Sequence, residues 1–262
     1  MAIDYSIQYD CVPRRELGDE TILELLKDQE RAQMIIGMFR QNGDPRPPSE
    51  MGYEFTRTTP EGDEETELIV VQDVLDRVEE LTVRAHYCRN CPANRRAQPY
   101  GCTGFIQYPI SGAGEAWMLN QLPSPQNALV WLLLKQGIDN FMYDGQDIAE
   151  LRRKGDTYFE DRKSVIRKLG EFDVNSNQLF EMTFTLGDIN PNHAGVLLLF
   201  FNAIERELEA DGIMSVGQAT YEQFPFQITS EYTDDKTINE LKSFLNALYV
   251  AWALKVNLHV VP

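Results

Sequence analysis

Two segments of the chain show the alternation of apolar and polar side chains that is typical of a half-buried β-strand. In residues 3–10, the apolar side chains take every second position, at Ile3, Tyr5, Ile7 and Tyr9. Residues 254–260 repeat the pattern, with apolar side chains at Leu254, Val256, Leu258 and Val260. The alternation therefore predicts a strand at each end of the sequence.

Strand patterns also occur between residues 53 and 110. Residues 53–56 and 67–70 predict a hairpin around a turn at 59–63, where Pro60 and Gly62 favour a change of chain direction. Residues 71–78 have the apolar spacing of a short helix. A strand near 81–87 is then expected to lead into a cysteine-containing segment, and a strand over 102–110 to follow it.

Helical patterns dominate the rest of the chain. Asp19 is placed to cap a helix that ends near Gly43, and a long helix is predicted from about 234 to 252. The dipeptides Ser124-Pro125 and Asn190-Pro191 each combine a capping residue with a proline suited to the first helical position. The helices that they start, through 128–134 and 196–204, are apolar on nearly every side, so both are predicted to be buried.

These elements predict an α+β fold with one mixed or antiparallel sheet that contains both terminal strands. The expected organisation is an α+β part over 1–111, a helical part inserted over 112–215, and residues 216–262 completing the first part. Together they are expected to form one compact domain, since 262 residues lie within the range of a large single domain.

The net charge and the hydropathy of the chain limit which classes of protein it can belong to. Lys and Arg number 24 against 41 Asp and Glu, which gives a formal net charge of -17. A surface this acidic repels nucleic acids and anionic membranes on average, and it attracts basic proteins. No apolar run approaches the roughly 18 residues that span a bilayer, and no targeting segment is visible. We expect a cytoplasmic protein without a membrane partner.

The spacing of the cysteines is the most specific signal for a functional site in this sequence. Of the four in the chain, Cys88 and Cys91 form a Cys-x-x-Cys pair and Cys102 follows within fifteen residues. Clustered thiols in a large intracellular chain point to a metal or to redox chemistry rather than to disulfides. We predict a structural zinc site made by Cys88, Cys91, Cys102 and Cys11. His86 is the alternative fourth ligand, and an iron–sulfur cluster, a redox pair or inert thiols are the alternatives to zinc.

Arginines surround this segment. Residues 81–114 contain no Asp or Glu but include Arg89, Arg95 and Arg96. These side chains could neutralise a zinc–thiolate site, or they could bind phosphate or nucleic acid, with neighbouring tyrosines stacking on bases.

Other motifs for catalysis are weak. Residues 111–115, Ser-Gly-Ala-Gly-Glu, resemble a dinucleotide-binding loop but lack its third glycine. His193 is better interpreted as a residue of a capped first helical turn than as an acid–base catalyst. The sequence therefore favours a non-catalytic protein, although it leaves an enzyme possible.

The predicted function is that of an interaction, adaptor or assembly protein that binds another macromolecule and is stabilised by structural zinc. Two alternatives use the same segment. One is a redox or sensing protein or metalloenzyme that uses an iron–sulfur cluster or the thiols. The other is a nucleic-acid or phosphate binder that uses the arginines.

Overall fold

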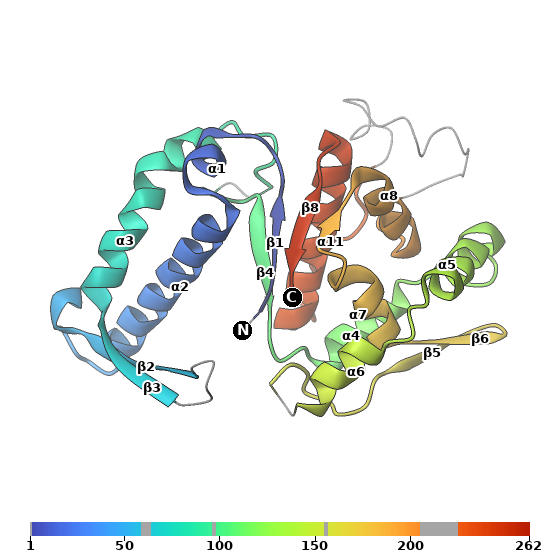
Figure 1. Ribbon diagram of the computed structural model, residues 1–262, viewed down its shortest axis with the longest axis horizontal. Helices are drawn as coiled ribbons and strands as arrows, with labels where there is room; N and C mark the ends of the chain where they lie inside the picture. Colours follow the sequence, from blue (N-terminus) through green and yellow to red (C-terminus); the bar gives the residue numbers. More distant parts are fainter. Residues whose placement is uncertain (1, 59–63, 96–97, 155–156, 205–224) are drawn as a thin grey trace. The chain divides into compact units, whose positions relative to one another are not determined.

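The computed structural model describes residues 2–58, 64–95, 98–154, 157–204 and 225–262 (Figure 1). Within this part of the chain, α-helices combine with antiparallel sheets, so the predicted α+β class is confirmed. No helix among the described residues is long and apolar enough to cross a membrane. Three predicted features lie outside the described residues: the turn at 59–63, the boundary at 215–216 and Arg96.

The chain divides into two compact units. Unit 1 comprises residues 1–9, 92–97 and 101–262, and unit 2 comprises residues 10–91 and 98–100. The described residues between 112 and 204 belong to the same unit as the terminal strands, and the insertion of a helical part over 112–215 stays a prediction.

Unit 1 is built on a four-stranded antiparallel sheet with the strand order β4-β1-β8-β7. The elements of the unit are β1 (Ala2–Ile7), β4 (Thr103–Gln107), α4 (Gly112–Asn120), α5 (Ala128–Phe141), α6 (Gln146–Arg153), β5 (Ile166–Leu169), β6 (Phe172–Asn175), α7 (Ser176–Phe184), β7 (Asp188–Ile189), α8 (Pro191–Phe200), α11 (Lys236–Leu254) and β8 (Leu258–Val261).

Strand β1 lies between β4 and β8. Tyr5 stands opposite Gly104 on one side and Val260 on the other. The two strands predicted at the ends of the sequence are therefore hydrogen-bonded neighbours in one sheet. The apolar positions of β1 are buried as predicted, at Ile3, Tyr5 and Ile7. The second strand is shorter than predicted, because Leu254 ends α11 and β8 begins at Leu258.

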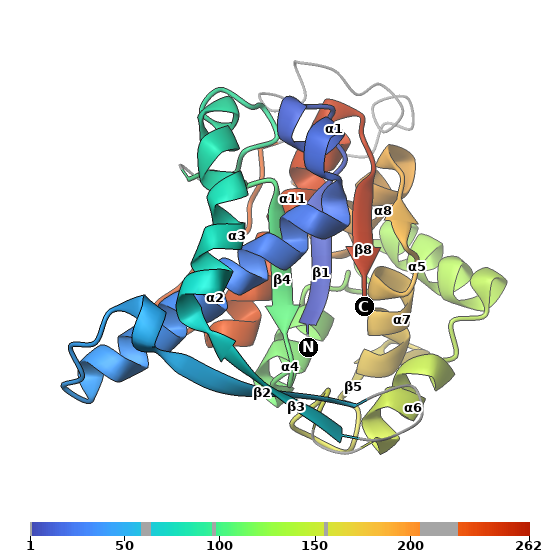
Figure 2. The same ribbon diagram turned by 60° about the vertical axis from the view of Figure 1, so that its left-hand side comes forward.

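Helix α11 lies against β1, β4 and β8 and supplies much of the core (Figures 1 and 2). Its start is fixed by Asp235, whose side chain accepts a hydrogen bond from the amide of Ile238 at 2.7 Å. The ring of Phe244 meets the ring of Tyr5 edge to face at 5.3 Å, and the Tyr5 hydroxyl donates to Ser243 Oγ. An apolar stripe and a polar cap thus hold the helix on the sheet.

Helix α5 differs from the sequence prediction in two ways. It begins at Ala128, because residues 124–127 first make a turn in which the Asn127 amide donates to the Ser124 carbonyl. Only one face of the helix is buried, at Val130, Leu134 and Ile138. The prediction that the whole helix is buried was wrong, because among the described residues only this face of α5 is covered. By contrast, α8 follows Asn190 and Pro191 as predicted and is mostly buried.

Unit 2 is a helical hairpin with a two-stranded sheet. Its elements are α1 (Val12–Leu17), α2 (Asp19–Gln41), η1 (Pro48–Glu50), β2 (Gly52–Thr58), β3 (Glu64–Val70), α3 (Val71–Arg84) and η2 (Ala85–Cys88). Two apolar clusters hold it together. One contains Ile22, Leu25, Val78, Leu81, Cys88 and Tyr100. The other contains Ala32, Met51, Val71 and Val74.

The segment before the cysteines is helical. We expected a strand near 81–87, but α3 continues to Arg84 and a 3₁₀ turn completes the path to Cys88. The helical spacing of Val71, Val74 and Val78 extends to Leu81, which packs in the first apolar cluster. This tertiary contact outweighs the strand preference of the β-branched residues Thr82 and Val83.

Two helical glycines provide a test of packing in unit 1. A Cβ atom on Gly114 would lie 2.4 Å from Thr237 Cγ2, whereas a Cβ atom on Gly137 would meet nothing within 4 Å. We expect Gly114→Ala to lower the free energy of unfolding by about 1–3 kcal/mol through overpacking. Gly137→Ala, the matched control, should raise it by roughly 0.5–1 kcal/mol because alanine favours helix. Urea denaturation measures both, and equal effects would contradict this packing.

Candidate functional site

Three of the four predicted ligand residues lie together in unit 2. Cys11 precedes the first turn of α1, and Cys88 ends the 3₁₀ turn η2. The Cys91 amide donates to the Cys88 carbonyl at 3.3 Å, so the Cys-x-x-Cys segment closes a tight turn. Cys88 interacts electrostatically with both Cys91 and Cys11. The tertiary structure therefore brings Cys11 within electrostatic range of Cys88, although they lie 77 positions apart in the sequence.

Cys88 occupies a buried position shaped by Tyr100. Burial raises the pKa of the Cys88 thiol, the backbone amide of Tyr100 opposes this by donating to the sulfur, and the negative charges of Cys91 and Cys11 raise the pKa further. Tyr100 has a left-handed backbone with φ of 59°, which is rare for a bulky residue. Its hydroxyl donates to the Leu81 carbonyl at 2.9 Å. The surrounding core thus holds a strained residue whose amide contacts the sulfur.

A raised pKa has a direct chemical consequence. Because burial raises its pKa, the Cys88 thiol stays protonated at neutral pH. A bound divalent cation reverses this preference and makes thiolates stable. All four cysteines are thiols rather than disulfides. Within the described ranges, no three His, Cys, Asp or Glu side chains converge closely enough to hold a metal ion.

The two remaining ligand candidates have different surroundings. Cys102 belongs to unit 1, where its carbonyl accepts a hydrogen bond from the Ile7 amide at 3.0 Å beside β1. His86 is exposed in unit 2, and its Nδ1 lies 3.0 Å from the Val83 carbonyl. The His86 ring stacks on Tyr87 with centroids 4.0 Å apart. A strand over 81–87 would have placed His86 and Cys88 on one face, but this segment is a helix end followed by a 3₁₀ turn.

The arginines of the segment are not equivalent. Arg95 donates to the carbonyl oxygens of Gly101, Thr103 and Ser243, and its guanidinium lies 5.5 Å from the centre of the Tyr5 ring. Its donors are thus used to join the chain before β4 to α11 within unit 1. Arg89 is exposed.

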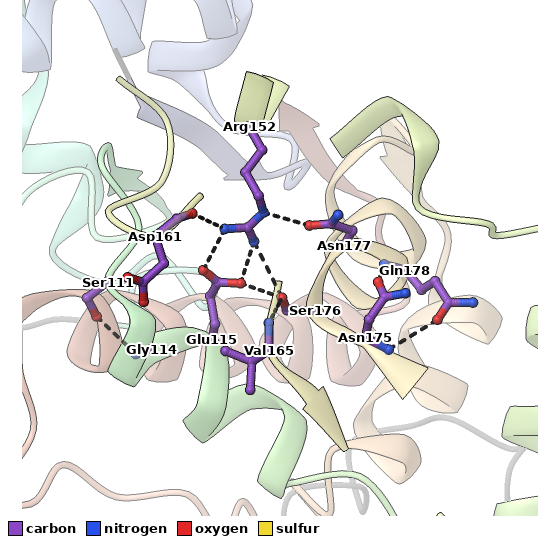
Figure 3. Close-up of polar contacts among 10 residues, drawn as sticks. All are labelled: Ser111, Gly114, Glu115, Arg152, Asp161, Val165, Asn175, Ser176, Asn177 and Gln178. Carbon is purple, nitrogen blue, oxygen red and sulfur yellow. Dashed lines mark hydrogen bonds and ion pairs between the residues drawn. The ribbon is translucent and has the colours of Figure 1, made fainter. Parts of the chain in front are cut away.

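Unit 1 contains a second polar cluster, which the sequence analysis did not find. Figure 3 shows Arg152 of α6 at its centre, paired through both terminal nitrogens with the two carboxylate oxygens of Glu115 on α4. Arg152 also donates to Asn177 Oδ1 at 2.9 Å and to the Asp161 carbonyl at 2.7 Å. Ser176 completes the cluster by donating to Glu115 and accepting from the Val165 amide. We call this group the Arg152 cluster.

The Arg152 cluster is enclosed. Glu115 and Ser176 are fully buried, and Arg152 is 5% exposed. The face of the Phe159 ring lies 3.9 Å from the guanidinium carbon of Arg152. A charged pair held in this way, with hydrogen bonds from several elements, fixes the positions of α4, α6 and α7. Because solvent does not reach Glu115 or Ser176, we interpret the cluster as structural.

The glycines before Glu115 serve this packing. A Cβ atom on Gly112 would lie 2.3 Å from Asp161 Oδ2. Ser111 caps α4 by accepting from the Gly114 amide at 2.9 Å, and its hydroxyl donates to Asp235. The glycines that resemble a dinucleotide-binding loop therefore allow close contact between elements of unit 1. The sequence contained one signal for the Arg152 cluster, which is the charged residue Glu115 within a mostly apolar helix.

The histidines of unit 1 match the capping interpretation. The amide of His193 donates to Asn190 Oδ1 at 3.0 Å, as expected for a helix start, and burial lowers the pKa of the half-buried imidazole. His259 Nδ1 lies 2.6 Å from Asp188 Oδ1 on the neighbouring strand. The His193 contact lies within one helical turn, whereas the His259 contact joins β8 to β7.

Comparison with known proteins finds no matching family model, no characterised protein and no solved structure similar to this chain.

The Arg152 cluster makes a sharp energetic prediction. Arg152→Met leaves the Glu115 carboxylate buried without its cation, so we expect the free energy of unfolding to fall by about 3–5 kcal/mol. The double variant Glu115→Met/Arg152→Met removes both charges and should be more stable than Arg152→Met alone. Urea denaturation followed by circular dichroism compares the native chain, Arg152→Met, Glu115→Met and the double variant. A double variant as unstable as the sum of both single variants would contradict the pairing.

Proposed function

We propose that this protein is a non-catalytic, intracellular macromolecule-binding protein in which zinc, held by Cys11, Cys88, Cys91 and Cys102, stabilises the fold. The observation that carries the proposal is the electrostatic interaction of Cys88 with Cys91 and Cys11 within unit 2, with the Tyr100 amide donating to the Cys88 sulfur. In metal–thiolate sites, backbone amides typically donate hydrogen bonds to the sulfur ligands. These hydrogen bonds partly offset the negative charge of the thiolates. Cys102 is two residues from Tyr100 in the sequence.

Zinc suits this donor set. It prefers a tetrahedral arrangement of thiolates, and a site closed by four protein ligands has no open position for a substrate. In such a site the metal replaces the protons on sulfur and joins segments that are distant in sequence, here residue 11 and residues 88–102. An iron–sulfur cluster would use the same cysteines and give a redox or sensing protein. The metal content therefore separates these functions.

The binding role is supported by the outer face of α3. Asp73, Asp76, Glu79 and Glu80 are all exposed on this helix, opposite its buried valines. With a net charge of -17, the chain presents an acidic field that steers basic partners toward it. We therefore propose a basic protein partner. The nucleic-acid alternative loses support, since the donors of Arg95 are used within unit 1.

Metal analysis of the purified chain tests the site. We expect about one zinc per chain and no visible colour, and we expect Cys11→Ser, Cys88→Ser, Cys91→Ser and Cys102→Ser each to lose the metal. His86→Ala, the control, should keep it because the imidazole lies against Val83. Plasma mass spectrometry and an absorption spectrum measure both properties.

Acidification provides a second readout of the same site. Protons compete with zinc for thiolates, and burial already raises the pKa of Cys88, so zinc should be released as the pH falls.

Other outcomes of the metal analysis would change the assignment. Iron with visible absorbance would assign the thiols to an iron–sulfur cluster instead. A chain that binds no metal, or variants that all retain zinc, would overturn the proposed site.

Binding to a lysine-rich peptide tests the acidic face of α3. Fluorescence anisotropy should show binding that weakens steeply as salt rises from about 0.05 to about 0.5 M. Reversing Asp73, Asp76, Glu79 and Glu80 to lysine should weaken binding by at least about tenfold.

A control variant has the same net charge as the α3 variant. Reversal of the exposed Glu150, Glu160, Glu171 and Asp173 of unit 1 changes the total charge equally but leaves α3 intact. Binding of this control should remain close to that of the native chain. Equal weakening of both variants would show that total charge alone attracts the peptide, and the α3 face would then have no specific role.

A further inference from the structure

The turn from Cys88 to Cys91 carries a thiol at each of its two ends. The Cys91 amide donates to the Cys88 carbonyl at 3.3 Å, which is the hydrogen bond that closes a β-turn. The first and last Cα atoms of such a turn lie less than about 7 Å apart. A disulfide joins cysteines whose Cα atoms are usually about 4.4–6.8 Å apart. The backbone of the turn thus holds the two cysteines at a separation that a disulfide can span.

Cys91 is better placed than Cys11 to pair with Cys88. Cys91 follows Cys88 by three positions, whereas Cys11 precedes it by 77. Of the two neighbouring thiols, Cys91 raises the pKa of Cys88 more than Cys11 does, as expected of a closer sulfur. The turn is also closed by its own hydrogen bond, so pairing of Cys88 with Cys91 needs no movement of a distant segment.

The two thiols of the turn differ in their access to solvent. Cys91 is half-buried, whereas Cys88 is 7% exposed and packs in the first apolar cluster of unit 2. A dissolved oxidant therefore reaches Cys91 first. Cys88 is held in place by the Tyr100 amide, which donates to its sulfur. An accessible thiol beside a fixed second thiol is the arrangement in which the second thiol resolves the oxidised form of the first.

From this turn we infer that Cys88 and Cys91 form a reversible disulfide when the protein meets a hydroperoxide. The Cys91 sulfur attacks one oxygen of hydrogen peroxide, the O–O bond breaks, and one water leaves as Cys91 becomes a sulfenic acid. The Cys88 sulfur then attacks the Cys91 sulfur, the S–O bond breaks, and a second water leaves with the Cys88 proton. The two thiols lose two electrons in total, and one peroxide is reduced to two waters.

The disulfide regulates the proposed zinc site. Zinc binds thiolates, so oxidation removes Cys88 and Cys91 from the four proposed ligands. The metal leaves as Zn²⁺ without changing its oxidation state, and two protons from solvent complete the two waters when thiolates react in place of thiols. The release of zinc rests on the proposed function, whereas the disulfide itself requires only the turn.

Peroxide treatment of the purified full chain tests the inference. After exposure to millimolar hydrogen peroxide, N-ethylmaleimide blocks the remaining thiols, and trypsin digests the chain without reduction. Because Arg89 lies between the two cysteines, Cys88 and Cys91 fall in different tryptic peptides. Mass spectrometry should find these peptides joined, with Cys11 and Cys102 alkylated. Dithiothreitol should restore all four thiols, and zinc should appear in the filtrate together with the disulfide.

Variants of unit 2 locate the reaction in the turn. Cys91→Ser removes the accessible thiol, so the disulfide should be lost. Cys11→Ser is the matched control, because it removes a neighbouring thiol and leaves the turn intact, and it should still join Cys88 to Cys91. Circular dichroism confirms that both variants are folded. Loss of the disulfide in both variants would overturn the assignment to the turn.

The outcomes for the native chain separate this inference from the proposed function. Pairing of Cys88 with Cys11 or Cys102 overturns the inference, as does oxidation of Cys91 to a sulfinic acid without a disulfide. Zinc that remains bound after peroxide, with all four thiols reduced, also overturns the inference but leaves the zinc site standing. A Cys88–Cys91 disulfide in a chain that never held zinc supports the inference and overturns the proposed site.

Discussion

The central position of β1 is the constraint on which unit 1 depends. A buried strand must pair its amide and carbonyl groups on both sides, and β1 does so with β4 on one edge and β8 on the other. Strand β8 is separated from β1 by most of the sequence. Completing the sheet therefore requires the intervening helices to be in place, and α11 then seals it, with Phe244 packed on Tyr5.

Charged groups inside the protein act under the same constraint of satisfied partners. Arg152 and Glu115 are buried together, and the hydrogen bonds of Ser176, Asn177 and the Asp161 carbonyl complete their coordination. Removing such groups from water is costly, so their main effect is to specify one arrangement of α4, α6 and α7. In unit 2, burial likewise disfavours a negative charge on the Cys88 sulfur. The hydrogen bond from the Tyr100 amide partly offsets this cost, and the proposed zinc would offset it further.

The acidic face of α3 differs in physical character from the interior of the protein. Its exposed carboxylates act through long-range attraction, which salt weakens. The buried groups act only through direct contact, so salt has little effect on them.

Local patterns in the sequence determined much of the fold. Alternation identified the strands β1 and β8, the Asn190-Pro191 pair located the start of α8, and the Cys-x-x-Cys spacing identified the thiols as candidate ligands. These features depend on neighbours within a few residues. Tertiary structure decided the rest: whether residues 81–84 continue a helix, whether α5 is buried on one side or all round, and which buried arginine meets Glu115. Each of these depends on which distant segment packs there, because burial, not local spacing, sets the energy of an apolar face or a buried charge.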